Sequence, residues 1–124
     1  MLSMSHLALV VEDEAALRMI YETVLRELDF DVIQAADGEE AIDALMHVTP
    51  SVVLLDVLLP KVDGNQVLNY IQTAPHLRDT VTVIVTAHSR FQTIMALAAK
   101  DMFLLKPVRP RDIQSAVERV LAHI

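Results

Sequence analysis

Short apolar runs of strand length recur along the chain, and segments with helical spacing separate them. The runs cover residues 7–11, 31–36, 51–55, 81–85 and 102–105. Most are continuous rather than alternating, as is typical of strands covered on both faces. Apolar residues with helical spacing are Leu17, Ile20, Val24 and Leu28, and later Ile113, Ala116, Val117, Val120 and Leu121. This alternation, repeated about five times, predicts an α/β fold with a parallel sheet and helices on both faces.

Polar residues and prolines mark the expected element boundaries. Asp37, with Glu40 three residues later, has the spacing of a helix N-cap, and Asp63 precedes the third expected helix. All five prolines are expected between elements: Pro50, Pro60, Pro75, Pro107 and Pro110. We find no repeat, low-complexity tract or linker, and therefore expect one domain over residues 1–124, with its core at about 7–121.

Composition narrows the class of protein. The chain has 124 residues, of which 53% are hydrophobic, enough for one sizeable core. It lacks cysteine, which excludes disulfides, thiol nucleophiles and cysteine-bound zinc and fits the cytoplasm, the location we expect. The net charge of −7 disfavours direct nucleic-acid binding. The first apolar run has no basic segment before it and ends at Glu12, so we expect neither a signal peptide nor a membrane span.

The residues that close the expected strands carry the candidate chemistry, because ligands of open α/β sheets bind beyond the carboxyl ends of the strands. These residues are Glu12, Asp13 and Glu14 after the first strand, Asp56 after the third, Thr86 at the end of the fourth, and Lys106 after the fifth. Acids gathered from two strands repel one another, so a cation is expected there, and a hard divalent ion such as Mg²⁺ suits oxygen ligands. With an ammonium group and a hydroxyl nearby, the set indicates phosphoryl transfer onto a carboxylate.

Each of these residues also has an ordinary explanation. Acids after a strand often form the first turn of a helix, threonine is a common strand residue, and a lysine before proline is usually solvated in a loop. Only the four residue types together, at four strand ends, favour the functional interpretation.

These residues and their order resemble the receiver domain of two-component response regulators, over about residues 7–121. The motifs that carry the resemblance are "VVEDE", "LLDVLLPKVDG", "VIVTA" and "FLLKP". The resemblance implies a flavodoxin-like (βα)5 fold, doubly wound, with a parallel five-stranded sheet in the order 2-1-3-4-5.

The resemblance also implies a role for each site residue. Asp56 would accept a phosphoryl group from a histidine kinase or a histidine phosphotransfer protein, and Thr86 and Lys106 would contact its oxygens. Mg²⁺, or Mn²⁺ in its place, would be bound directly by Asp13, Asp56 and the backbone carbonyl of Leu58, and through water by Glu12. The peptide bond between Lys106 and Pro107 is expected to be cis.

Three further positions are expected to shape the switch. Phe103, three residues before Lys106, is at the position of the family's two-state aromatic residue, and as a phenylalanine it cannot form a hydrogen bond through its ring. An ordinary core position is the alternative for this side chain. Leu58 and His88 would flank the phosphoryl group; the apolar Leu58 side chain would restrict the hydrolytic water, whereas His88 would orient water or cap the fourth helix.

The stretch before the fifth strand departs from the family pattern. Many receivers have glycines there, whereas this chain has "AAKDMF". We interpret residues 91–99 as a fourth helix that is apolar nearly all round, and two explanations stay open: outward alanines that need no cover, or a docking face. In the second, Phe91 and Met95 join the fifth strand and helix to bind a downstream protein or form a homodimer.

Two rival functions fit the sequence less well than a signalling switch. A haloacid-dehalogenase-type phosphatase would carry a second aspartate two residues after the nucleophile, where this chain has Leu58. A pseudo-receiver that serves only as an interaction module is disfavoured because Glu12, Asp13, Asp56, Thr86 and Lys106 are all present. We therefore expect a phosphoacceptor signalling domain rather than an enzyme acting on a second substrate. The cognate kinase, and whether the domain stands alone, stay open.

Overall fold

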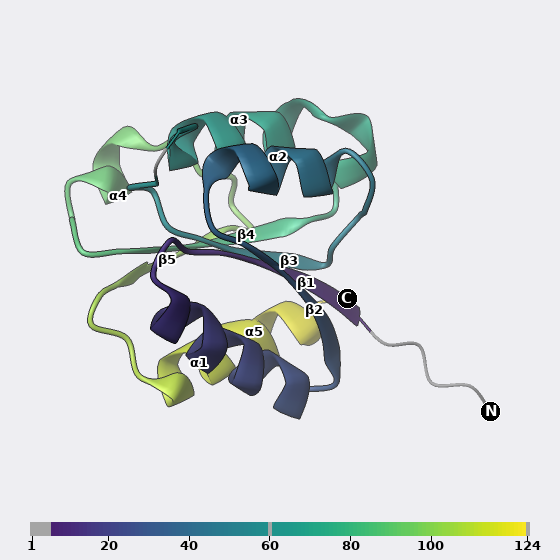
Figure 1. Cartoon of the computed structure of the whole chain (residues 1–124), viewed down its shortest axis with the longest axis vertical. Coiled ribbons are helices and arrows are strands. Elements are labelled where there is room, and N and C mark those ends of the chain that lie inside the picture. Colours follow the sequence, from purple (N-terminus) through teal and green to yellow (C-terminus); the bar gives the residue numbers. More distant parts are fainter. Residues whose placement is uncertain (1–5, 60, 124) are drawn as a thin grey trace.

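The computed structural model describes residues 6–59 and 61–123, and its centre is a five-stranded parallel sheet (Figure 1). The strands are β1 (His6–Val11), β2 (Phe30–Ala35), β3 (Val52–Leu55), β4 (Val81–Thr86) and β5 (Met102–Leu105). Their order is β2-β1-β3-β4-β5, and every neighbouring pair is parallel. The flavodoxin-like prediction is thereby confirmed, with β1 and β3 side by side at the centre.

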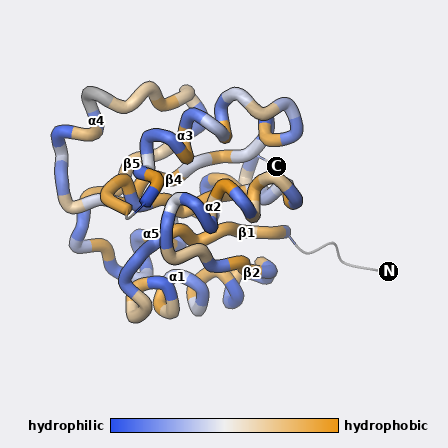
Figure 2. The backbone as a smooth tube through the Cα atoms, turned by 45° about the horizontal axis from the view of Figure 1, so that its top comes forward, coloured by the Kyte–Doolittle hydropathy of each residue, from blue (hydrophilic) through white to orange (hydrophobic). Residues whose placement is uncertain are grey.

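Helices cover both faces of the sheet and enclose two hydrophobic clusters. The helices are α1 (Ala15–Glu27), α2 (Gly38–Leu45), α3 (Gly64–Thr73), a 3-10 turn η1 (Pro75–Leu77), α4 (Phe91–Ile94) and α5 (Pro110–Leu121). In Figure 1, α1 and α5 lie on one side of the sheet and α2, α3 and α4 on the other. Residues of β3 are buried on both faces, with Val52 and Leu54 in one cluster and Val53 and Leu55 in the other. Figure 2 shows the same pattern as hydrophobic strands inside more polar helices.

The helix starts follow the predicted caps. The Asp37 carboxylate accepts a hydrogen bond from the Glu40 backbone N–H at 2.8 Å, and Asp63 forms a capping box with Gln66. Pro75 and Pro110 differ from the prediction because they are the first residues of η1 and α5 rather than lying between elements. Proline is tolerated there because the first helical N–H groups need no partner within the helix. Pro60 lies outside the described residues.

The buried face of α1 is turned slightly from the predicted one. Tyr21, Val24 and Leu25 are the buried residues of this helix, whereas Ile20 is exposed. The predicted stripe included Ile20 and did not include Tyr21, which is 2% exposed and belongs to the core. Tyr21, Val24 and Leu25 face the sheet because they belong to the hydrophobic cluster that also contains residues of β1, β3 and α5.

The fourth helix is much shorter than predicted. It ends at Ile94, and Met95 already has an extended backbone, with φ −87° and ψ 134°. Polar side chains hold the following segment: Gln72 Nε2 donates to the Ala96 carbonyl at 2.6 Å, and Asp101 accepts from the Ala98 N–H at 3.0 Å. The prediction of an exposed docking role for Met95 is also wrong, because this side chain is buried in the cluster beneath α3.

Candidate functional site

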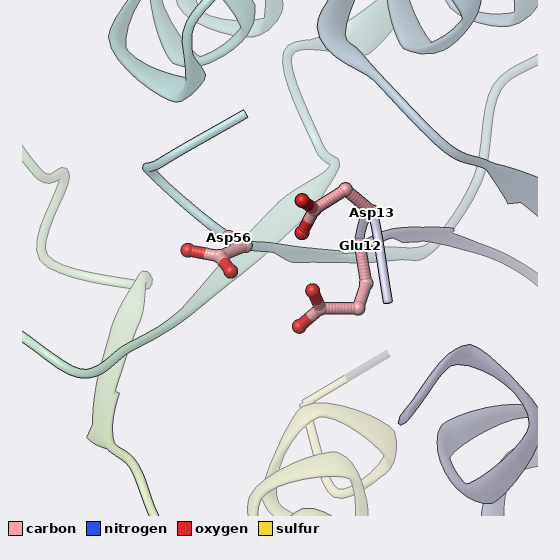
Figure 3. Close-up of side chains that lie close together, drawn as sticks. All are labelled: Glu12, Asp13 and Asp56. Carbon is pink, nitrogen blue, oxygen red and sulfur yellow. The ribbon is translucent and has the colours of Figure 1, made fainter. Parts of the chain in front are cut away.

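The carboxyl ends of the central strands bring the predicted polar residues to one edge of the sheet. Glu12 and Asp13 follow β1, Asp56 follows β3, Thr86 closes β4 and Lys106 follows β5. Figure 3 shows the side chains of Glu12, Asp13 and Asp56 close together at the ends of two neighbouring strands. A backbone hydrogen bond holds the ends of β1 and β3 together, because the Asp56 N–H donates to the Val11 carbonyl at 3.0 Å.

Lys106 joins the two buried acids of the site. Its Nζ lies 2.7 Å from Glu12 Oε1 and 3.0 Å from Asp56 Oδ2. The three side chains are 19%, 2% and 9% exposed, respectively. The backbone places the ammonium group, because the Lys106 N–H donates to the Thr86 carbonyl at 2.7 Å. The bond between Lys106 and Pro107 is cis, as the resemblance predicted.

The charges in this site shift one another's ionisation. Burial raises the pKa of Glu12 above its ordinary value, although the hydrogen bond from Lys106 opposes this effect. Burial alone would lower the pKa of Lys106, but the hydrogen bonds and charges of Glu12 and Asp56 outweigh burial and raise it. Lys106 therefore stays charged at neutral pH and partly compensates the two acids.

The acidic cluster fits a hard divalent cation. Glu12, Asp13 and Asp56 each offer one carboxylate oxygen, and these oxygens all lie within 4.8 Å of one another. Glu12 and Asp56 are buried, whereas Asp13 is exposed, so the space between them is open to ions from solvent. Oxygen-only donors from carboxylates, with room for water, are what Mg²⁺ prefers.

Leu58 lies next to the Asp56 carboxylate. Its backbone N–H donates to Asp56 Oδ1 at 3.1 Å, and its residue surface is 48% exposed. Asp56 Oδ1 and Oδ2 thus have different partners, a backbone amide and the Lys106 ammonium group. Metal binding by the Leu58 carbonyl stays a prediction.

Thr86, His88 and Phe103, the other predicted site residues, make contacts outside the acidic cluster. The buried Thr86 hydroxyl accepts a hydrogen bond from the His88 backbone N–H at 3.4 Å. The His88 ring packs edge to face against Phe91, with ring centroids 6.1 Å apart. Phe103 is half-buried and packs against the cluster beneath α3. The roles predicted for these three residues stay predictions.

Two neighbours of the site were missed from sequence. Arg18 on α1 donates from Nη1 to the Glu12 backbone carbonyl at 2.7 Å. Tyr21, also on α1, has a buried hydroxyl without a hydrogen-bond partner among the described residues. Burial raises its pKa to about 12, and the charges of Lys106, Glu12 and Asp56 act on it as well. No sequence motif marks Arg18 or Tyr21. The signal that could have found them is their position on the helix that directly follows Glu12 and Asp13, one to two turns along it.

Fold and site together define a signal-receiving domain with an acidic, lysine-paired cluster at the sheet edge. The family model described as "Response regulator receiver domain" matches residues 8–118. The chain therefore belongs to the response regulator receiver domain family and is a signal-transduction receiver.

Relatives and solved structures agree with this assignment. The chain is 35% identical over 119 residues to "Probable transcriptional regulator ycf27" of Porphyridium aerugineum, covering 94% of this chain and 48% of the relative. It is 31% identical over 114 residues to the alkaline phosphatase synthesis transcriptional regulatory protein PhoP of Bacillus subtilis, covering 91% and 47%. The chain thus spans about half the length of these curated relatives.

One similar solved structure is the receiver domain of the sensor histidine kinase PA1611 of Pseudomonas aeruginosa, described with a magnesium ion in its active-site cleft. Its TM-score is 0.84 at 23% identity, covering 96% of this chain and 99% of that one, and the likeness concerns the fold. Among the described residues, every helix is too short or too polar to cross a membrane.

Proposed function

We propose that Asp56 is the phosphoacceptor of this receiver domain and that a phosphohistidine on a histidine kinase or phosphotransfer protein is the donor. The observation that carries the proposal is that the Asp56 carboxylate lies 3.0 Å from the Lys106 ammonium group and close to the acids that follow β1. A carboxylate oxygen attacks phosphorus, the phosphorus–nitrogen bond of the donor breaks, and the electron pair leaves with the imidazole. The product is an acyl phosphate on Asp56.

Charge stabilisation is the main contribution that the site offers to this transfer, as in other phosphoryl transfers. Glu12, Asp13, Asp56 and the Leu58 carbonyl would hold Mg²⁺, or Mn²⁺ in its place, with Glu12 acting through water. The ion supplies positive charge for the phosphoryl oxygens when it is bound. Lys106 adds a second positive charge, and the Thr86 hydroxyl would donate a hydrogen bond once it turns from the His88 N–H.

A change of partner surface would follow from phosphorylation. Thr86 and Phe103 lie on adjacent strands, with Ile84 paired to Phe103 in the β4–β5 register. Movement of Thr86 toward the phosphoryl group would give the Phe103 ring room to move inward. The chain would then populate the conformation with Phe103 turned inward more often, and the surface at β5 would change.

The proposed partner surface is a groove of about 450 Å³ between β5 and α5. Apolar side chains from β5, from α5 and from the loop between them line it, including Met102, Leu104, Val108 and Ala116. We propose that a downstream protein, or a second copy of the chain, binds there with phosphorylation-dependent affinity. The chain would act by protein contact in the cytoplasm and would turn over no second substrate.

The test is phosphorylation by a small donor. The purified chain is incubated with acetyl phosphate and Mg²⁺, and its intact mass is measured. We expect the mass of one added phosphoryl group in the wild type, and none with chelator or in Asp56→Asn. A matched acid-to-amide control is Asp79→Asn, because the Asp79 side chain is 93% exposed in a pair with Arg78 far along the chain from the site. Failure of the wild type to gain mass, or a gain in Asp56→Asn, would overturn the proposal.

A further inference from the structure

The two glycines of this chain both lie against the backbone of the loop that follows Asp56. Gly64 closes the loop: its N–H donates to the Val57 carbonyl at 2.8 Å, and a Cβ there would lie 2.7 Å from the Asp56 carbonyl oxygen. Gly38, at the start of α2, faces the other end of the loop, where a Cβ would clash with the backbone carbonyl of Val62. The sequence contains no other glycine. Both positions therefore allow close backbone approach to one loop, at residues 57–59 and 61–63.

An ion pair joins the same two segments. Lys61 Nζ lies 3.4 Å from Asp37 Oδ2, and the Asp37 side chain is only 8% exposed. The Glu40 backbone N–H lowers the pKa of Asp37, and Lys61 lowers it further, so this acid is charged at neutral pH. Lys61 has a φ of 66°, a left-handed conformation that is uncommon for residues other than glycine and asparagine. The surroundings must offset the cost of this conformation, and Lys61, whose side chain is 60% exposed, contacts Asp37 while it adopts it.

We propose that Asp37 and Lys61 are positioning residues that hold the loop after Asp56 against the start of α2 and thereby pre-form the metal site. The proposal rests on the proposed function, because the loop carries Leu58, whose N–H bonds to Asp56 and whose carbonyl is an expected ligand. Neither Asp37 nor Lys61 belongs to the acidic cluster at the site. They act on the cation through the backbone of the loop.

The expected size of the effect follows from population arithmetic. A cation binds to the fraction of molecules whose loop is in place, so its apparent Kd rises by the inverse of that fraction. If loss of the pair leaves the loop in place about a third to a fifth of the time, Mg²⁺ binding weakens about threefold to fivefold. The Asp37 cap and the glycine contact remain, which is why we expect a partial loss.

The variants separate the ion pair from other roles of these residues. Asp37→Asn keeps a side-chain oxygen for the helix cap and removes the charge. Lys61→Asn removes the charge and suits the left-handed backbone. The double variant tests whether the two residues act as one pair. Asp79→Asn and Arg78→Gln change the net charge equally in an exposed pair elsewhere, with side chains 93% and 85% exposed.

Two measurements read the effect on the full chain. Mg²⁺ titration calorimetry should show the threefold to fivefold loss in both single variants, no further loss in the double variant, and no change in the two controls. Amide hydrogen exchange without metal should show faster exchange of Leu58 and Gly64 in the same variants. Amide exchange of Leu58 and Gly64 at the wild-type rate in these variants would overturn the proposal, whether or not Mg²⁺ binds. Additive losses of Mg²⁺ affinity in the double variant would overturn it as well. Absence of Mg²⁺ binding to the wild type would instead contradict the proposed function.

Discussion

Replacing Lys106 by methionine removes the positive charge that lies between two buried acids. Methionine keeps much of the side-chain length and has no charge. Glu12 and Asp56 would then be left together, with carboxylate oxygens no more than 4.8 Å apart. At that separation two ionised carboxylates repel by about 3.5 kcal/mol with an effective dielectric constant near 20.

The repulsion between Glu12 and Asp56 cannot cost more than protonating Glu12, because the variant can take up a proton to remove one of the two charges. Taking the carboxyl group from its ordinary pKa of 4.5 to the neutral form at pH 7 costs about 3.4 kcal/mol. We therefore expect Lys106→Met to lower the free energy of unfolding by about 3 kcal/mol at pH 7, in the range found when one partner of a buried pair is removed.

The pH dependence has a definite sign. Burial already raises the pKa of Glu12 in the wild type, and the hydrogen bond from Lys106 opposes this effect. Loss of that hydrogen bond in the variant should raise the pKa further, so above pH 4.5 the folded variant should bind more protons than the folded wild type. Stability of the variant relative to wild type should then fall as pH rises, and the deficit should shrink to about 1 kcal/mol near pH 5. Saturating Mg²⁺ should stabilise the variant more than the wild type, because the ion neutralises the unpaired acids.

Urea unfolding followed by circular dichroism measures these quantities at pH 7 and pH 5, with and without Mg²⁺. The matched control is Lys100→Met, which removes an exposed lysine whose ammonium group donates to the Arg78 carbonyl. We expect a deficit below about 1 kcal/mol for the control, without pH dependence. A deficit in Lys106→Met that is below 1 kcal/mol at pH 7, or equal at both pH values, would refute the reasoning.

Three further predictions concern other parts of the structure. Leu58→Asn should speed decay of the phosphorylated form about twofold to tenfold, the rate equivalent of one hydrogen bond to water, and an unchanged decay rate would defeat the idea that Leu58 excludes water. In Tyr70→Phe, where Tyr21 is the remaining tyrosine, absorbance titration should give a pKa of about 12; a value near 10 would show that the ring is not buried. Asp101→Ala should cost about 1–3 kcal/mol in urea unfolding, because the N–H groups of Thr82 and Ala98 lose their acceptor, and a neutral result would show that water replaces it.

The sheet was predictable because burial on both faces leaves a strong sequence pattern. The run "SVVLL" places alternate residues in two opposite clusters, and no polar residue interrupts it before Asp56. The meeting of Glu12, Asp13, Asp56 and Lys106 followed from the rule that carboxyl ends of parallel strands share one edge. Chain order alone was enough for that inference once the strands were assigned.

The short fourth helix was not predictable from its own residues. Residues 91–99 contain neither glycine nor proline, so local propensity gives no reason to stop at Ile94. The reason is tertiary: Gln72 on α3 and Asp101 before β5 bond to backbone groups of the segment that follows. Contacts between residues far apart in sequence decide this end, as they decide the pairing of Asp37 with Lys61.

The central claim is that Asp56 itself accepts the phosphoryl group. Borohydride reduction of the chain after incubation with acetyl phosphate converts an aspartyl phosphate to homoserine, and tandem mass spectrometry locates the converted residue. The account predicts homoserine at position 56 when Mg²⁺ is present and none when it is chelated. Homoserine at Asp13 or another aspartate, or none at position 56 in the presence of Mg²⁺, would contradict it.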